Sequence, residues 1–135
     1  MERGTPALQI DLASPQPAYE QITSGLRTLL VAGTFRPGSQ LPTVRQLAMD
    51  LGVHHNTVAE AYRILAEEGW LDLKRGRGAI VIERPRPEAT PEARAKFARH
   101  LQEQVARAIA EGVPRAAIAR ELDDLTRKLR AGGIK

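Results

Sequence analysis

The chain has 135 residues, of which 42% are hydrophobic and 27% charged, so it fits one globular domain or a small domain with an appendage. The chain contains no cysteine and so has no disulfides or thiolate chemistry. Its N-terminus does not resemble a secretory signal and it has no apolar run of ~20 residues, so it is expected to be cytoplasmic and not to enter a membrane. The net charge of +4 favours nucleic acid as a partner, but residues 1–83 hold eight Lys and Arg against nine Asp and Glu, so charge alone does not decide.

The first predicted element is a helix that follows a leader of residues 1–14. Apolar residues recur at spacings of three and four from Ile22 to Leu30, which predicts one buried helix face. Gly33 ends this helix, and residues 34–42, with a Pro-Gly pair, are typical of turns.

Two further helices are predicted next. Thr43 begins one as its N-cap, and Gln46 has the spacing of a capping box. Gly52 ends it, and the next helix runs from about His55 to Glu68. Two helices joined by so short a turn predict a helix-turn-helix at about 43–67. Their apolar inner faces are formed by Val44, Leu47, Ala48, Leu51, Val58, Ala61, Tyr62 and Leu65.

After Gly69 the hydrophobic period changes to about two. Residues 70–74 and 79–83 predict short strands, joined by the glycine-rich, basic sequence RGRG at 75–78. The hairpin at about 70–83 completes a winged helix-turn-helix domain over residues 15–83. A proline-rich linker, 84–92, follows and is expected to be stiff.

Residues 93–132 predict two amphipathic helices broken at EGVP. Two short helices cannot bury such apolar stripes against each other alone, so we expect a second copy of the chain to cover them. The predicted fold class is mainly α with a small β-hairpin, namely an N-terminal winged helix-turn-helix and a two-helix C-terminal dimerisation tail. The expected dimerisation residues are Phe97, Leu101, Val105, Ile109, Ile118, Leu122, Leu125 and Leu129.

The order of these elements predicts DNA binding. The major groove of B-DNA is about 12 Å wide and admits one helix, whose N-terminal side chains reach the bases. The third helix begins with four side chains that all form hydrogen bonds, and arginine suits the electronegative minor groove. The candidate DNA-binding residues are Thr43, Arg45, His54, His55, Asn56, Thr57, Arg75, Gly76, Arg77 and Gly78.

Simpler interpretations stay open for several of these positions. Arg45 can pair with Asp50, residues 75–78 can form only a tight hairpin, and Asn56 and Thr57 can serve only as helix caps. A metal site and catalysis are not expected at the adjacent histidines. Neighbouring helical residues point about 100° apart, and no orienting carboxylate or nucleophile motif is present. We therefore expect no metal, no cofactor and no enzymatic activity.

The sequence closely resembles the GntR family of bacterial transcription regulators. The resemblance lies in PAYEQI (17–22), LR (26–27), RPGSQLPTVRQLAMDLGVHHNTVAEAYRILAEEGWL (36–71) and GRGAIVIE (76–83), and covers about half of the chain. It implies a homodimer that binds operator DNA, with Arg45 and residues 54–57 at the major groove and the wing glycines around Arg77 at the minor groove. The remaining ~50 residues resemble the compact YtrA-like branch, whose short helical tail dimerises. They leave no room for a dedicated effector domain, although a small-molecule effector is not excluded.

One pair departs from the family pattern, which at positions 54–55 is usually Ser or Thr followed by Arg. Histidine is a poor N-cap residue, so a weaker cap is expected, and the loss of Arg removes a bidentate reader of guanine. Imidazole titrates near neutral pH, so we expect binding to DNA to strengthen as the pH falls from 8 to 6.

The sequence therefore predicts a sequence-specific transcriptional regulator, a dimeric repressor on a two-fold symmetric operator of double-stranded DNA. The alternative is a winged-helix protein-interaction module whose C-terminal helices recruit a partner. A basic wing and a polar helix tip favour the regulator, because a purely protein-binding module does not need them.

Overall fold

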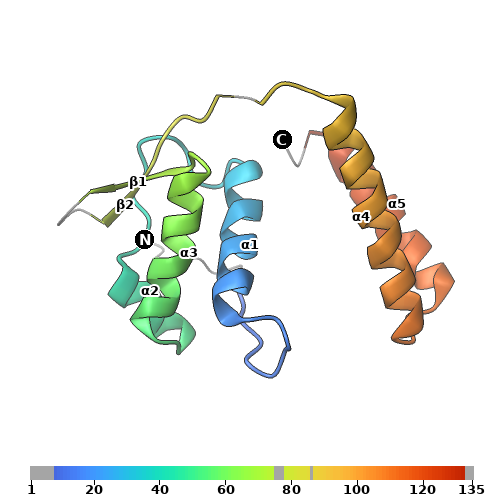
Figure 1. The fold of residues 1–135 in the computed structure, drawn as a ribbon, viewed down its shortest axis with the longest axis horizontal. Helices are drawn as coiled ribbons and strands as arrows, with labels where there is room; N and C mark the ends of the chain where they lie inside the picture. The colour runs from blue at the N-terminus through green and yellow to red at the C-terminus, as the bar shows by residue number, and fades with distance from the viewer. Residues whose placement is uncertain (1–7, 75–77, 86, 133–135) are drawn as a thin grey trace. The chain divides into compact units, whose positions relative to one another are not determined.

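The computed structural model describes residues 8–74, 78–85 and 87–132. The chain divides into two compact units, Met1–Arg84 and Pro85–Lys135. Their elements, drawn in Figure 1, are α1 (Ala18–Val31), α2 (Val44–Leu51), α3 (His55–Glu67), β1 (Leu71–Lys74), β2 (Gly78–Val81), α4 (Pro91–Ala110) and α5 (Arg115–Arg130). The predicted fold class, mainly α with a small hairpin, is confirmed.

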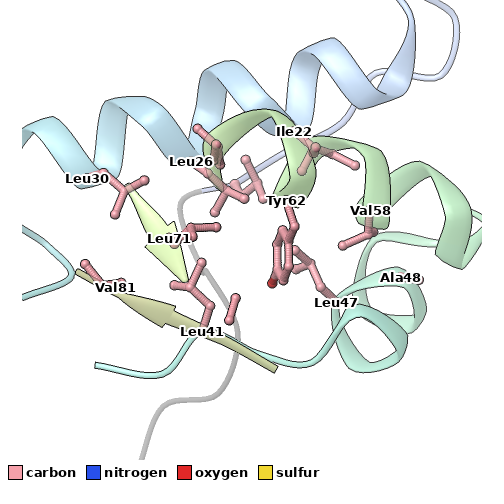
Figure 2. Packing of buried hydrophobic residues seen from close by; sticks show 14 residues of the cluster. Ile22, Leu26, Leu30, Leu41, Leu47, Ala48, Val58, Tyr62, Leu71 and Val81 are labelled. Carbon is pink, nitrogen blue, oxygen red and sulfur yellow. The ribbon is translucent and has the colours of Figure 1, made fainter. Parts of the chain in front are cut away.

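The first unit is built around the apolar faces of its three helices. α1 and α3 run side by side, and α2 packs against α3 (Figure 1). Figure 2 shows the side chains of these helices meeting those of the hairpin in one cluster. The predicted inner faces of α2 and α3 lie in this cluster or pack against it, as does Trp70. The buried core consists of Leu8, Ile22, Leu26, Leu30, Leu41, Leu47, Ala48, Val58, Ala61, Tyr62, Leu65, Leu71, Ala79 and Val81.

The segment before α1 packs onto that helix. The side chain of Gln21 holds it through both of its polar atoms, since Oε1 accepts from Asp11 N at 2.8 Å and Nε2 donates to Asp11 O at 2.9 Å. Leu8 is buried in the core directly over Gly25, where a Cβ would lie 2.1 Å from Leu8 Cδ1. The stretch expected to be a leader, residues 1–14, thus contributes Leu8 to the core.

The helix-turn-helix is fixed by two hydrogen bonds and a glycine. Thr43 Oγ1 accepts from Gln46 N at 3.1 Å, whereas the amide of Gln46 donates to Asp50 Oδ1 at 2.9 Å, so among the described residues only the first bond of the predicted capping box forms. Gly52 ends α2 at φ 72°, a left-handed conformation that glycine adopts without strain. Tyr62 Oη donates to Pro42 O at 2.7 Å and so ties α3 to the residue before the α2 cap.

The hairpin gains a third backbone segment from residues that the sequence predicts to form turns. β1 and β2 pair antiparallel from Leu71↔Val81 to Lys74↔Gly78. Residues 39–41 then pair with the other edge of β2, since Leu41 N donates to Ala79 O at 2.9 Å and Val81 N donates to Ser39 O at 2.8 Å. Three residues are too few to show an alternating pattern, so this pairing has no sequence signal.

The second unit is a helical hairpin without a closed core. Thr90 caps α4 by accepting from Ala93 N at 3.0 Å. Neither α4 nor α5 contains a buried residue. Phe97 is 65% exposed and Leu129 is 54% exposed, while Val105, Ile109, Ile118 and Leu122 are half-buried. Among the described residues, no helix combines the length and hydrophobicity that a membrane crossing needs.

Candidate nucleic-acid interface

The start of α2 lies close to the end of β2 that adjoins the hairpin turn. A Cβ on Gly78 would lie 4.0 Å from Thr43 Cγ2 and 3.6 Å from Gln40 Nε2. Thr43 is exposed, and so is Arg45, two residues along the chain from it. The edge pairing of residues 39–41 with β2 causes this proximity, since it binds the chain just before α2 to the strand that begins at Gly78.

Arg45 keeps its charge available. The pairing with Asp50 that the sequence left open does not form, and Asp50 accepts a hydrogen bond from Gln46. Within the described part of the chain, Arg45 makes no ion pair. An exposed, unpaired guanidinium is the group that a phosphate or a guanine edge recognises.

The first turn of α3 is capped by a histidine. His54 has the extended backbone of an N-cap residue, φ −70° and ψ 145°, and its Nδ1 accepts a hydrogen bond from Asn56 N at 3.0 Å. The His55 ring stacks on it, with the ring centroids 4.3 Å apart and the planes 27° apart. A side-chain cap therefore forms where the sequence predicts a weaker one, because the imidazole accepts the hydrogen bond that Ser or Thr accepts elsewhere.

The other candidate residues at this helix start differ in exposure. Asn56 is exposed, as are both histidines, whereas Thr57 is half-buried. The structure thus forms two separate pairs of neighbouring candidate residues. Thr43 lies near Gly78, and His54 lies against His55. In the described residues no hydrogen bond or ion pair joins the first pair to the second. Arg75, Gly76 and Arg77, the predicted wing tip, lie outside the described residues.

Acidic side chains of α3 are neutralised within the first unit. Arg63 forms ion pairs with Glu60, at 2.6 Å, and with Glu67. Arg27 Nη2 lies 2.6 Å from Glu68 Oε2. Hydrogen bonds from these guanidinium groups lower the pKa of the Glu60 and Glu68 carboxyls. Arg63 is therefore occupied by carboxylates, unlike Arg45.

Gln40 lies in the segment that pairs with the outer edge of β2, and the sequence does not predict its place there. Its backbone bridges to Ile80 and its side chain borders Gly78. A lone polar residue inside a Pro-Gly turn carries no signal of strand pairing, so sequence alone does not find it. In the part of the chain that the structure describes, no group of three His, Cys, Asp or Glu side chains has metal-binding geometry.

Comparison with known proteins gives consistent relatives. Residues 18–81 match the family model described as bacterial regulatory proteins, gntR family. The HTH-type transcriptional repressor YtrA of Bacillus subtilis is 42% identical over 76 residues, which are 56% of this chain and 58% of that protein. The chain thus matches less than two thirds of that relative's length.

Two solved structures extend the likeness to the fold. YtrA from Sulfolobus acidocaldarius, a GntR-family transcription factor, is 32% identical with a TM-score of 0.54, and the match covers 76% of this chain and 97% of that one. The structure of AraR(DBD) in complex with operator ORX1 is 25% identical with a TM-score of 0.51, over 55% of this chain and 95% of that one. By their names, YtrA of Bacillus subtilis is a transcriptional repressor and the AraR structure is a complex with an operator.

Proposed function

Since the chain belongs to the GntR family of bacterial regulatory proteins, we propose that it is a transcriptional repressor that binds operator DNA in the cytoplasm. The observation that carries the proposal is the exposed, unpaired Arg45 at the start of α2, the helix start that borders the turn end of the hairpin, together with the polar first turn of α3. A helix start with these groups fits the major groove.

The proposed contacts follow from these positions. Arg45 binds a phosphate or a guanine at the groove edge, while His54, His55 and Asn56 meet bases or phosphates. Thr43 and Thr57 contact the DNA backbone, and Gly78 allows the turn end of the wing to approach closely. For Arg75, Gly76 and Arg77 the proposal of a minor-groove contact rests on the sequence alone.

The decisive experiment compares two arginines of opposite environment. DNA fragments that the protein selects from its source genome supply the operator, and fluorescence anisotropy gives Kd over a series of salt concentrations. Arg45→Ala is expected to weaken binding and to lower the salt slope by about one, because one phosphate contact is lost. Arg63→Ala is the matched control, since its guanidinium is held by Glu60 and Glu67. An Arg45→Ala protein with the parent's affinity and slope would remove Arg45 from the interface.

We further propose that two copies associate through the α4–α5 hairpin and recognise a two-fold symmetric operator. The apolar stripe there has no cover within its own unit, with Phe97 and Leu129 more than half exposed. A second copy provides a matching stripe, and a two-fold dimer presents two equivalent α3 helices.

Sedimentation of one variant tests the dimer. Phe97→Lys removes an apolar side chain of ~2 kcal/mol from each of two copies, which raises the dimer Kd by roughly a hundredfold or more. Val113→Lys is the control, because Val113 is exposed in the turn between the two helices, off the stripe. A Phe97→Lys protein that sediments as the parent dimer contradicts the proposed interface.

A further inference from the structure

The two stacked histidines at the start of α3 are chemically distinct. The cap bond requires His54 Nδ1 to be an acceptor, since it receives the N–H of Asn56. A neutral imidazole with an accepting Nδ1 carries its proton on Nε2. Protonation of Nδ1 removes the cap and places a cation at the positive end of the helix dipole. The cap bond is therefore made by the imidazole form that carries its proton on Nε2.

His55 lies one residue further along, as the first residue of α3. In the described residues, neither of its ring nitrogens takes part in a hydrogen bond, and its ring contact is the stacking on His54. A proton added to His55 leaves the cap between His54 and Asn56 intact. Of the two rings, His55 is thus the one that can gain charge without loss of the cap bond, although its charge also stands at the positive end of the helix dipole.

The charged groups around this turn do not supply a carboxylate partner within the protein. On α1, Glu20 accepts from the Tyr19 hydroxyl at 3.3 Å and Arg27 pairs with Glu68; on α2, Asp50 accepts from Gln46. No ion pair among the described residues involves either ring. Among the described residues no carboxylate pairs with either ring, whereas DNA supplies a phosphate that can stabilise a protonated ring. The charged residues of α3 and the elements packed against it are Glu20 and Arg27 (α1), Arg45 and Asp50 (α2), Glu60, Arg63 and Glu67 (α3), and Asp72 and Lys74 (β1).

We propose that the pair divides two roles in DNA binding, an inference that rests on the proposed function. His54 is a positioning residue that stays neutral, caps α3 and presents Nε2–H as a donor, which selects acceptors such as phosphate oxygen or guanine O6 and N7. His55 takes up one proton when DNA binds. Affinity then rises as the pH falls from 8 to 6, by at most about tenfold per pH unit because a single proton is linked to binding.

The test measures Kd for selected operator DNA from pH 8 to pH 6 in three chains. His54→Asn replaces the ring by a non-titrating side chain whose Oδ1 stands as many bonds from Cα as Nδ1, so the cap remains and the pH dependence is expected to persist. His55→Gln is expected to abolish it. Long-range ¹H–¹⁵N spectra of the free protein are expected to show His54 protonated on Nε2 alone.

Each other outcome decides against the proposal. A flat parent profile, a slope lost in His54→Asn, or a proton on His54 Nδ1 at pH 7 overturns the division of roles while DNA binding itself stands. If no chain binds selected DNA at any pH, the proposed function fails and takes the role of His55 with it. The spectra then still decide the tautomer of His54, because they need no DNA.

Discussion

Replacing Tyr62 by Phe isolates the hydrogen bond that ties the two helices of the helix-turn-helix together. The side chain is 2% exposed, and its hydroxyl donates to Pro42 O at 2.7 Å, across 20 residues of sequence. Figure 2 shows the ring standing beside Leu47 in the centre of the cluster. Phe keeps this packing and leaves the Pro42 carbonyl without its donor, which costs about 1–2 kcal/mol at a half-buried acceptor. For a unit of this size, that lowers Tm by roughly 5–15 °C.

Trp70 provides an assay that follows the first unit. It is the single tryptophan of the chain, it packs against the core cluster, and the guanidinium carbon of Arg84 lies 4.7 Å from its ring centroid. Its emission during urea unfolding therefore reports the loss of packing around this core. The two arms of the comparison are Tyr62→Phe and Tyr19→Phe, since the Tyr19 hydroxyl makes only an exposed bond to Glu20 at 3.3 Å. Equal midpoints for Tyr62→Phe and the parent would refute the reasoning.

The same pair of tyrosines carries a pH signature. Burial raises the pKa of Tyr62 well above its ordinary value of 10.0. The unfolded chain thus loses this proton at a pH where the folded chain keeps it, so stability falls as the pH rises above about 10. Tyr62→Phe removes that part of the alkaline loss, and its stability curve is expected to be flatter there than the curve of Tyr19→Phe.

Two further predictions concern single contacts of the first unit. Gly25→Ala gains up to about 1 kcal/mol of helix propensity but pushes Leu8 aside, so it is expected to destabilise the parent and to stabilise a Leu8→Ala chain. Urea unfolding of the four chains measures both effects. An effect of the same sign in both backgrounds contradicts the contact between Leu8 and Gly25. Arg27 holds the pKa of the Glu68 carboxyl below its usual range, so this ion pair adds about 1 kcal/mol of stability above pH 4.5 that is lost as the pH falls. Glu68→Gln should therefore lower the free energy of unfolding at pH 7, and its stability should converge with that of the parent near pH 3. A difference that stays constant with pH would exclude this ion pair as the cause.

The fold was largely predictable because its helices carry strong periodic signals. Ile22, Leu26 and Leu30 lie on the buried face of α1, and the inner faces of α2 and α3 were identified residue by residue. What the sequence did not indicate are contacts between distant segments without a repeating pattern. Burial of Leu8 depends on the absence of a side chain at Gly25, 17 positions away, and periodicity cannot report such a gap.

Prediction of the site was limited in the same way. Residues near helix starts were placed correctly at helix starts, but whether Arg45 pairs with Asp50 depends on side-chain choices that spacing does not determine. In the structure Gln46, four residues before Asp50 on the same helix, donates to that carboxylate, and Arg45 makes no ion pair among the described residues. The edge pairing of residues 39–41, which brings Thr43 next to Gly78, depends on the three-dimensional course of the chain.

The cap at His54 depends on the protonation state of the imidazole ring, a dependence that a single preference of histidine for the N-cap position does not express. Nδ1 is attached to Cγ, as is the Oδ1 of Asn or Asp, so a neutral imidazole reaches the backbone N–H of the second helical residue as those strong capping side chains do. A protonated imidazole has no acceptor and carries a charge that the helix dipole opposes. The low ranking of histidine among capping residues averages over both forms. A serine would cap α3 at any pH, whereas His54 caps it only in the neutral form, which is the form that we propose it keeps at the start of the helix that enters the major groove.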